Sequence, residues 1–170
     1  MKSSIGFSLV EVLVAILVLA IGLVGLATLQ MAGLRSNQTA YYRSVATELA
    51  YDMIDRMRAN AVGVTAGYYK QTAVGSSGDA SKCENDPSKS CSASELAGYD
   101  LARWNNALAA GLPSGQGIVC LDSTPEIGTA TSPACDGSSN VYAIKIWWAD
   151  DRSVGAATTQ GFVTSFQLGN

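Results

Sequence analysis

The chain has 170 residues, a formal net charge of −3 and no histidine. The absence of histidine excludes Ser-His-Asp triads, Cys-His nucleophiles and His-ligated metal sites. The 11 lysine and arginine residues form no basic stripe, so nucleic-acid binding has no electrostatic support. We therefore expect a protein that is not an enzyme and that has no catalytic residues, no cofactor and no bound metal.

The N-terminal part of the chain contains one long uncharged run. Glu11 is the only charged residue between Lys2 and Arg35, and residues 12–34 carry no ionisable side chain. As a helix this run would reach about 35 Å, which is enough to cross a hydrocarbon core of roughly 30 Å. A carboxylate near the start of a span costs a few kcal/mol unless something neutralises it. The pattern therefore indicates a function for Glu11.

The residues before the run form a motif, Gly6-Phe7-Ser8-Leu9-Val10-Glu11. This motif resembles the type III leader of type IV prepilins and type II secretion pseudopilins. The resemblance implies a leader of residues 1–6, a cut between Gly6 and Phe7 by a prepilin peptidase, and N-methylation of Phe7. The alternative is an ordinary signal or an uncut anchor. A secretory signal, however, has a shorter apolar core that precedes its cleavage site.

In such proteins the glutamate is the fifth mature residue, as Glu11 would be here. The resemblance implies that the ammonium group of Phe7 in one subunit pairs with Glu11 of its neighbour in a filament. A buried ion pair adds little net stability, but an unpaired partner is costly, so the pair would favour one axial register of the subunits.

The helix should continue beyond the apolar run. After Arg35, apolar residues recur at three- and four-residue steps, and Asp52 lies four residues before Arg56, as in a helix ion pair. No proline occurs from Phe7 to Asn60, and Gly63 is the expected stop. We expect one stem, with a membrane and filament-core half at residues 7–34 and an amphipathic half at residues 35–60. Two helices with a break near residues 35–38 are the alternative.

Glycines take the place of a proline inside the stem. Major pilins commonly carry a proline near the position of Thr28, whereas this chain has Gly22 and Gly25 nearby. These glycines could loosen the helix in a filament or allow close packing between helices, and both interpretations stay open.

Cysteine usage indicates where the rest of the chain lies. The even set of four cysteines falls after the span, which suits an oxidising compartment, and Lys2 before the span favours a cytoplasmic N-terminus. We expect a single pass through the inner membrane with a periplasmic head at residues 61–170.

The head should begin with an irregular region at residues 62–94. Ser92 and Glu95 form a capping box that opens a second helix, which runs to about Ala110 before Gly111 and Pro113. Its apolar stripe consists of Ala97, Leu101, Trp104 and Leu108.

Three strands should follow, at residues 117–121, 141–149 and 161–168, as an antiparallel meander that covers the amphipathic half of the stem. Alternation directs Ile144, Ile146 and Trp148 towards the stem and places Lys145 on the outer face. Trp147 is then a surface residue or a partner contact, and we favour the surface.

Locality predicts the disulfides. Cys83 and Cys91 flank a turn that contains Pro87, and a Cys120–Cys135 bond would hold down the loop of residues 122–140. A bond between Cys91 and Cys120 is the rival, and four cysteines allow three pairings.

Acidic residues and cysteines offer no other site. Asp100, Asp150 and Asp151 are scattered, and the last two fit a solvated turn better than a calcium site. No Cys-x-x-Cys pair supports zinc.

The order of the head features narrows the resemblance. The features are a long stem, a loop flanked by cysteines, the helix Glu95-Leu96-Ala97-Gly98-Tyr99-Asp100-Leu101-Ala102-Arg103-Trp104, the turn Leu112-Pro113-Ser114-Gly115 and a tryptophan-bearing strand. The order of these features resembles that of PilV-type minor pilins, the type IV pilus modification proteins. The resemblance implies the α+β type IV pilin fold, with a long N-terminal helix packed against a small antiparallel sheet and a second short helix.

The same resemblance implies a role in pilus assembly. Such proteins act with other minor pilins and the major pilin to start the pilus, lie at or near its tip, help present an adhesin, and support adhesion and twitching motility. A minor pseudopilin of type II secretion is the nearest alternative. A membrane-anchored periplasmic binding domain is the second alternative.

Overall fold

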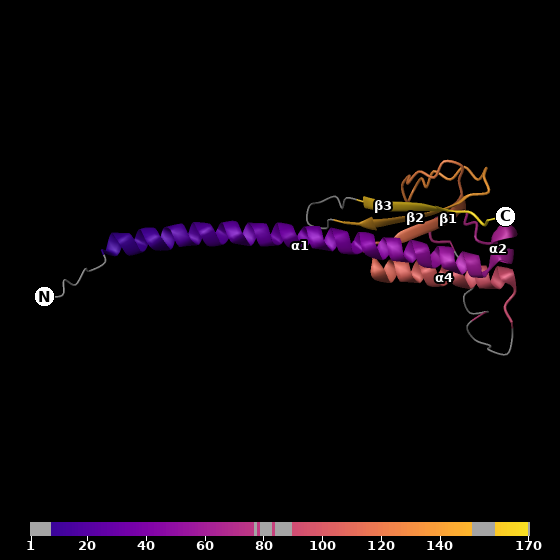
Figure 1. Ribbon diagram of the computed structural model, residues 1–170, viewed down its shortest axis with the longest axis horizontal. Helices are drawn as coiled ribbons and strands as arrows, with labels where there is room; N and C mark the ends of the chain where they lie inside the picture. The colour runs from indigo at the N-terminus through magenta and orange to yellow at the C-terminus, as the bar shows by residue number, and fades with distance from the viewer. Residues whose placement is uncertain (1–7, 77, 79–82, 84–89, 151–158, 170) are drawn as a thin grey trace. The chain divides into compact units, whose positions relative to one another are not determined.

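The computed structural model describes residues 8–76, 78, 83, 90–150 and 159–169, and its helices precede its strands (Figure 1). The elements in chain order are α1 (Leu9–Ala59), α2 (Ala61–Thr65), α4 (Ala93–Gly111), β1 (Gln116–Leu121), β2 (Tyr142–Ala149) and β3 (Thr159–Phe166). The chain divides into two compact units, Met1–Ala40 and Tyr41–Asn170. The long N-terminal helix, the three-stranded antiparallel sheet and the second helix confirm the expected α+β arrangement.

Helix α1 is continuous through residues 35–38, so the alternative of two separate stem helices is wrong. It ends at Ala59 because Asn60 begins a new helix: the Asn60 side chain accepts a hydrogen bond from the Gly63 amide at 3.1 Å. The expectation that Gly63 ends the stem is therefore wrong, since Gly63 lies inside α2. The five-residue α2 also corrects the expectation of an irregular region from residue 62 onwards.

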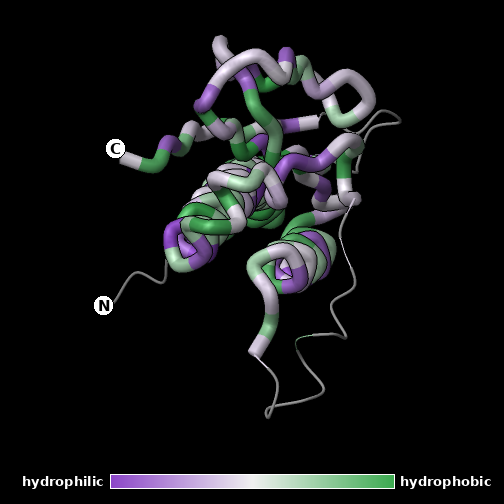
Figure 2. Tube along the Cα trace, turned by 90° about the vertical axis from the view of Figure 1, so that its right-hand side faces the viewer, coloured by the Kyte–Doolittle hydropathy of each residue, from purple (hydrophilic) through white to green (hydrophobic). Residues whose placement is uncertain are grey.

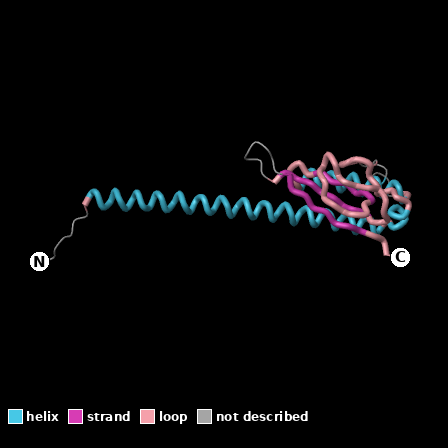
Figure 3. Tube along the Cα trace, turned by 90° about the horizontal axis from the view of Figure 1, so that it is seen from above, coloured by secondary structure: helices cyan, strands magenta, loops and turns pink. Residues whose placement is uncertain are grey.

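The three strands form an antiparallel meander in the order β1-β2-β3, as predicted. One face of this sheet packs on residues 41–59 of α1, and Figure 3 shows the strands from above in magenta. The main core lies between them and includes Ala46, Ala50, Met53, Met57, Tyr142, Ile144, Ile146 and Trp148, all 5% exposed or less. The predicted orientation of Ile144, Ile146 and Trp148 towards the stem is confirmed.

Helix α4 completes this core from a second side, and Figure 2 shows it beside α1 with the strands above. The predicted capping box is present, with Ser92 and Glu95 each bonding to the other's backbone amide. Trp104 is fully buried, and its indole Nε1 donates to the carbonyl oxygen of Leu49 at 2.9 Å. A Cβ at Gly117 would lie 2.5 Å from the Trp104 ring, so only glycine lets β1 approach α4 this closely.

The outer face of the sheet is also covered, contrary to expectation. The loop after β1 folds back over this face and forms a second core with the outward side chains of the sheet. Its buried members are Ile118, Cys120, Ala143 and Trp147, and Val74, Ile127, Ala130 and Cys135 pack against them. Trp147 is only 3% exposed, so the prediction of a surface residue is wrong. Strand alternation gives the face of a residue but does not say what covers that face.

Lys145 lies on the outer face as predicted, but it is fully buried. Its ammonium group donates to Asp122 Oδ2 at 2.6 Å and to the carbonyl oxygens of Pro133 and Ala134 at 2.7 and 3.0 Å. Asp122 is 1% exposed, and its Oδ1 accepts from the Thr124 amide. All three donors of the ammonium group are thus used, which offsets much of the cost of removing the charge from water.

Two disulfides join neighbouring parts of the head. Cys120 is bonded to Cys135 with 6.2 Å between their Cα atoms, and Cys83 is bonded to Cys91 with 5.7 Å. The first bond ties the covering loop to β1, beside the buried lysine. Non-reducing peptide mapping is the measurement that distinguishes this local pairing from a Cys91–Cys120 bond.

Removing one partner of the buried ion pair should destabilise the head strongly. We expect Lys145→Met to lower the free energy of unfolding by about 3–5 kcal/mol, because Asp122 would stay buried without a cation. The double variant Lys145→Met/Asp122→Leu should recover most of this loss. Denaturant unfolding of the full chain in detergent, followed by tryptophan fluorescence, measures both.

The exposed Arg58–Asp55 pair provides the matched control for this experiment. Arg58→Met should cost less than about 1 kcal/mol, as surface ion pairs do. A Lys145→Met variant as stable as Arg58→Met would contradict the assignment of Lys145 as the residue that holds the loop.

Candidate assembly site on the N-terminal helix

The first turn of α1 positions Glu11. The Glu11 amide donates to the carbonyl oxygen of Ser8 at 3.0 Å and lies 3.4 Å from the Ser8 hydroxyl, so Ser8 caps the helix start. The Glu11 side chain is exposed, in the first turn, where the positive end of the helix dipole favours a carboxylate. Gly6 and Phe7 lie outside the described residues, so the cut and the methylation site stay predictions.

The apolar run beyond Glu11 has no packing partner within the described chain. Every residue from 12 to 34 is exposed, including large side chains such as Leu29 at 72% and Leu34 at 69%. Among the described residues, α1 is the one helix long and apolar enough to cross a membrane. A contiguous apolar surface of this length requires lipid or other protein around it.

Small residues interrupt the bulky ones along this surface. A Cβ added at Gly22, Gly25 or Gly33 would meet nothing within 4 Å. Thr28, at the position where major pilins commonly have proline, donates its hydroxyl to the Val24 carbonyl at 2.9 Å and so leaves the helix intact. The space beside these glycines leaves room for a neighbouring helix to pack closely. The other interpretation, that the glycines loosen the helix in a filament, also stays open.

Two family models match the chain. The model for the prokaryotic N-terminal methylation motif matches residues 1–27, and the model described as type IV pilin Tt1218 matches residues 28–102. Together these matches cover residues 1–102 and support a type IV pilin with a prepilin leader. Neither the curated proteins nor the solved structures contain a match.

The methylation motif implies that this pilin is a prepilin-peptidase substrate and assembles with other pilins into a pilus. Its long apolar helix fits an anchor in the inner membrane before assembly. The match to the type IV pilin model covers α1 from residue 28 onwards, all of α2 and the first half of α4, but none of the three strands. The type IV pilin family is a family of structural proteins, which agrees with the expectation that the chain is not an enzyme.

Processing can be tested at the predicted cut. We expect Gly6→Val to block cleavage while insertion into the membrane proceeds, because the apolar run that drives insertion is unchanged. The measurement is the gel mobility of the chain, in membranes from cells with and without a prepilin peptidase. A variant that is shortened like the wild type would show that Gly6 is not read by the peptidase.

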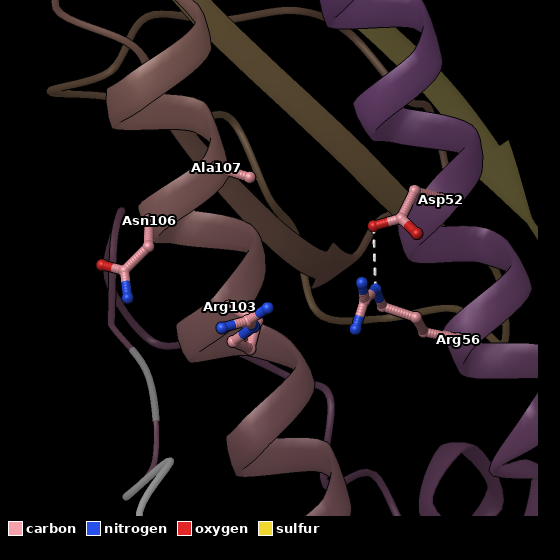
Figure 4. A pocket seen from close by; sticks show the side chains of 5 residues that line it. All are labelled: Asp52, Arg56, Arg103, Asn106 and Ala107. Carbon is pink, nitrogen blue, oxygen red and sulfur yellow. Dashed lines mark hydrogen bonds and ion pairs between the residues drawn. The ribbon is translucent and has the colours of Figure 1, made fainter. Parts of the chain in front are cut away.

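The head of the pilin carries a polar groove between α1 and α4 (Figure 4). It has a volume of about 300 Å³ and is lined by Asp52, Arg56, Arg103, Asn106 and Ala107. The predicted helix pair is present, with Arg56 Nε 2.8 Å from Asp52 Oδ2, and Arg56 also contacts Asp100 at 3.3 Å. The guanidinium thus links two carboxylates, one on each helix, and the groove holds paired charges rather than a free acid or base.

Asp100, which contacts Arg56 of this groove, also belongs to a buried network of hydrogen bonds. Tyr69 donates to Asp100 Oδ2 at 2.5 Å, and Asn60 Nδ2 contacts the Tyr69 oxygen at 3.2 Å and donates to the carbonyl of Ala93 at 2.8 Å. The network joins the end of α1, the start of α4 and the segment between them. Burial, and then the hydrogen bond to Asp100, raises the pKa of Tyr69 well above its ordinary value.

The sequence did not predict this network because its members lie far apart in the chain. Tyr69 and Asp100 are 31 residues apart, and Arg56 and Asp100 are 44 residues apart. The described residues contain no cluster of acids and cysteines that could hold a metal ion. Asp100 therefore contributes to the order of the head through its bonds to Tyr69 and Arg56.

The raised pKa of Tyr69 makes the head sensitive to alkaline pH. A phenol with a raised folded pKa contributes stability that is complete below its unfolded pKa of about 10 and is lost as pH rises further. Tyr69→Phe should lower stability by about 1–3 kcal/mol at neutral pH, since Asp100 loses a donor, and should flatten the alkaline decline. Burial also raises the pKa of Tyr142, so Tyr142 should still contribute to the loss of stability at alkaline pH in the Tyr69→Phe variant.

The test is the unfolding free energy of both forms measured from pH 7 to 11. Tyr68→Phe is the matched control, because Tyr68 is 49% exposed. An alkaline decline of equal steepness in wild type and Tyr69→Phe would contradict the assignment.

Proposed function

We propose that this pilin is a minor pilin of the PilV type, which helps to start pilus assembly and lies at or near the pilus tip. In that role it would act with other minor pilins and the major pilin, help present an adhesin, and support adhesion and twitching motility. The membrane and filament-core half would be residues 7–34, the amphipathic half residues 35–60, and the periplasmic head residues 61–170.

The main observation in support of this proposal is the packing of α4 against α1. Trp104, in the segment that resembles PilV-type proteins, is fully buried and hydrogen-bonded to the Leu49 carbonyl of the stem. The segment is thus a structural part of the head. A minor pseudopilin usually has a smaller head, so α4 favours the minor pilin.

A second observation concerns the end of the head at α2. Ala61, Val62, Thr65 and Ala66 line a shallow cavity of about 430 Å³, and Val62 is 71% exposed. This uncharged surface follows directly after the stem and supports contact with a further protein beyond the head. The alternative of a periplasmic binding domain has less support from this cavity, because its one polar side chain is that of Thr65, whose hydroxyl donates to the Ala61 carbonyl of the same helix.

Glu11 provides the test of the assembly role. We expect Glu11→Ala to be cleaved normally but to lower the amount of chain in sheared pili by about tenfold, because the neighbouring ammonium group would lack its carboxylate. Quantitative mass spectrometry of sheared pili measures this amount against the most abundant pilin. The wild-type chain should be a small fraction of that pilin.

Glu48→Ala is the matched control, since Glu48 is an exposed acid in the same helix. Incorporation of Glu11→Ala at the wild-type level would refute the role of Glu11 in assembly. A wild-type chain as abundant as the principal subunit would instead refute the assignment as a minor pilin.

A further inference from the structure

The two edges of the sheet differ. The outer edge of β1 is covered by the segment after α2: the Gln71 amide donates to the Val119 carbonyl at 2.9 Å, and the Gln71 side chain accepts from the Val119 amide at 2.6 Å. Further along, the Gly75 amide donates to the Gly117 carbonyl at 3.0 Å. The fold therefore protects one edge with a strand-like segment of its own chain.

The other edge belongs to β3, which is the most exposed strand of the three. In β2 seven of eight residues are buried, whereas β3 has one buried residue, Phe166, at its end. Within the described part of the chain, no hydrogen bond reaches the outer edge of β3. Its residues, Thr-Gln-Gly-Phe-Val-Thr-Ser-Phe, include no charge and no proline, the two features that commonly protect a free edge.

The register shows which backbone groups of β3 point outwards. The backbone groups of Gly117 and Val119 face the covering segment. β1 therefore bonds to β2 through Ile118, which is paired with Lys145, and through every second residue on either side of Ile118. Along a strand the backbone groups of successive residues point to opposite sides. β2 therefore bonds to β3 through Ile144, which is paired with Thr164, and through every second residue on either side of Ile144. The amides and carbonyls of Thr159, Gly161, Val163 and Ser165 therefore point away from β2, and no other described residue bonds to them.

We propose that the outer edge of β3 is a docking site for an extended segment of a different polypeptide, which adds to the sheet as a fourth strand. The segment is uncharged and has alternate apolar side chains. On the α1 side it covers Phe162, which is half-buried and packs against the main core. Backbone hydrogen bonds supply the attachment and the apolar side chains the specificity.

Antiparallel pairing with a second copy of this chain does not fit the site. Two identical β3 strands that pair antiparallel are related by a two-fold axis perpendicular to the sheet, which reverses every direction in the sheet plane. Since residues 41–59 of α1 pack flat on the sheet, these segments of the two copies would then run in opposite directions, which does not suit subunits that share one membrane or one filament polarity. Head-to-tail addition of a copy in the same orientation would need the free edge of its β1, which Gln71 and Gly75 cover.

Amide exchange on the wild-type chain tests the site directly. The full chain in detergent is compared with the same chain in sheared pili, by hydrogen exchange with residue-level mass spectrometry. Exchange at Gly161, Val163 and Ser165 should be at least about tenfold slower in pili, as expected for amides that enter a ladder. Unchanged exchange in pili overturns the proposal, and so does protection that rises with the concentration of the purified chain, because that would identify a second copy.

A pair of substitutions at one position provides an independent readout. Val163→Pro removes an amide that points away from β2, so the ladder to β2 is kept while strand addition is blocked. It should lower the amount of chain in sheared pili by about tenfold, whereas Val163→Thr, which keeps the amide, should behave as wild type. Equal incorporation of the two variants counts against the site.

Thermal unfolding of the purified variants shows whether Val163→Pro is folded, and if it is not, the exchange result on the wild type decides. The proposal rests on pilus assembly but not on copy number or position at the tip. A chain that is abundant in pili and has a protected β3 edge would refute the proposed minor role and leave the docking site standing.

Discussion

The structure of this pilin depends on the burial of one face of α1 between residues 41 and 59. Ala46, Ala50, Met53 and Met57 are completely buried there, and they meet the apolar face of the sheet and the Trp104 side of α4. Ala46 and Ala50 are small, and the indole ring of Trp104 approaches the helix closely enough to bond to the backbone carbonyl of Leu49. Without this stripe neither the sheet nor α4 would have a surface to cover.

The outer layer of the head depends on a different kind of interaction. The loop between β1 and β2 has little regular structure, and its attachment comes from the buried Lys145–Asp122 pair and the Cys120–Cys135 bond. The lysine binds two carbonyl groups of the loop as well as the carboxylate, so it specifies where the loop lies. The pair costs desolvation but removes the alternatives that a purely apolar contact would permit.

Two surfaces of the described chain remain without an internal partner, and both suit assembly. The apolar part of α1 needs lipid or other helices, which agrees with the pilin match. The β3 edge needs backbone hydrogen bonds, which lipid cannot supply but another chain can. A subunit with both surfaces could be held in a filament through its stem and bound to a specific neighbour through its head.

The sequence by itself determined the elements whose signals are local. The leader motif, the unbroken helix, the capping box at Ser92 and the alternation in β2 follow from residues a few positions apart, and the inward face of β2 was therefore predicted correctly. The sequence failed where long-range contacts decide. The burial of Trp147 and Lys145 depends on a loop that folds back over the sheet, and the Tyr69–Asp100 network depends on residues 31 positions apart. Only the tertiary structure decides which faces are covered and which edge stays free, because coverage depends on where distant segments meet and local patterns carry no information about that.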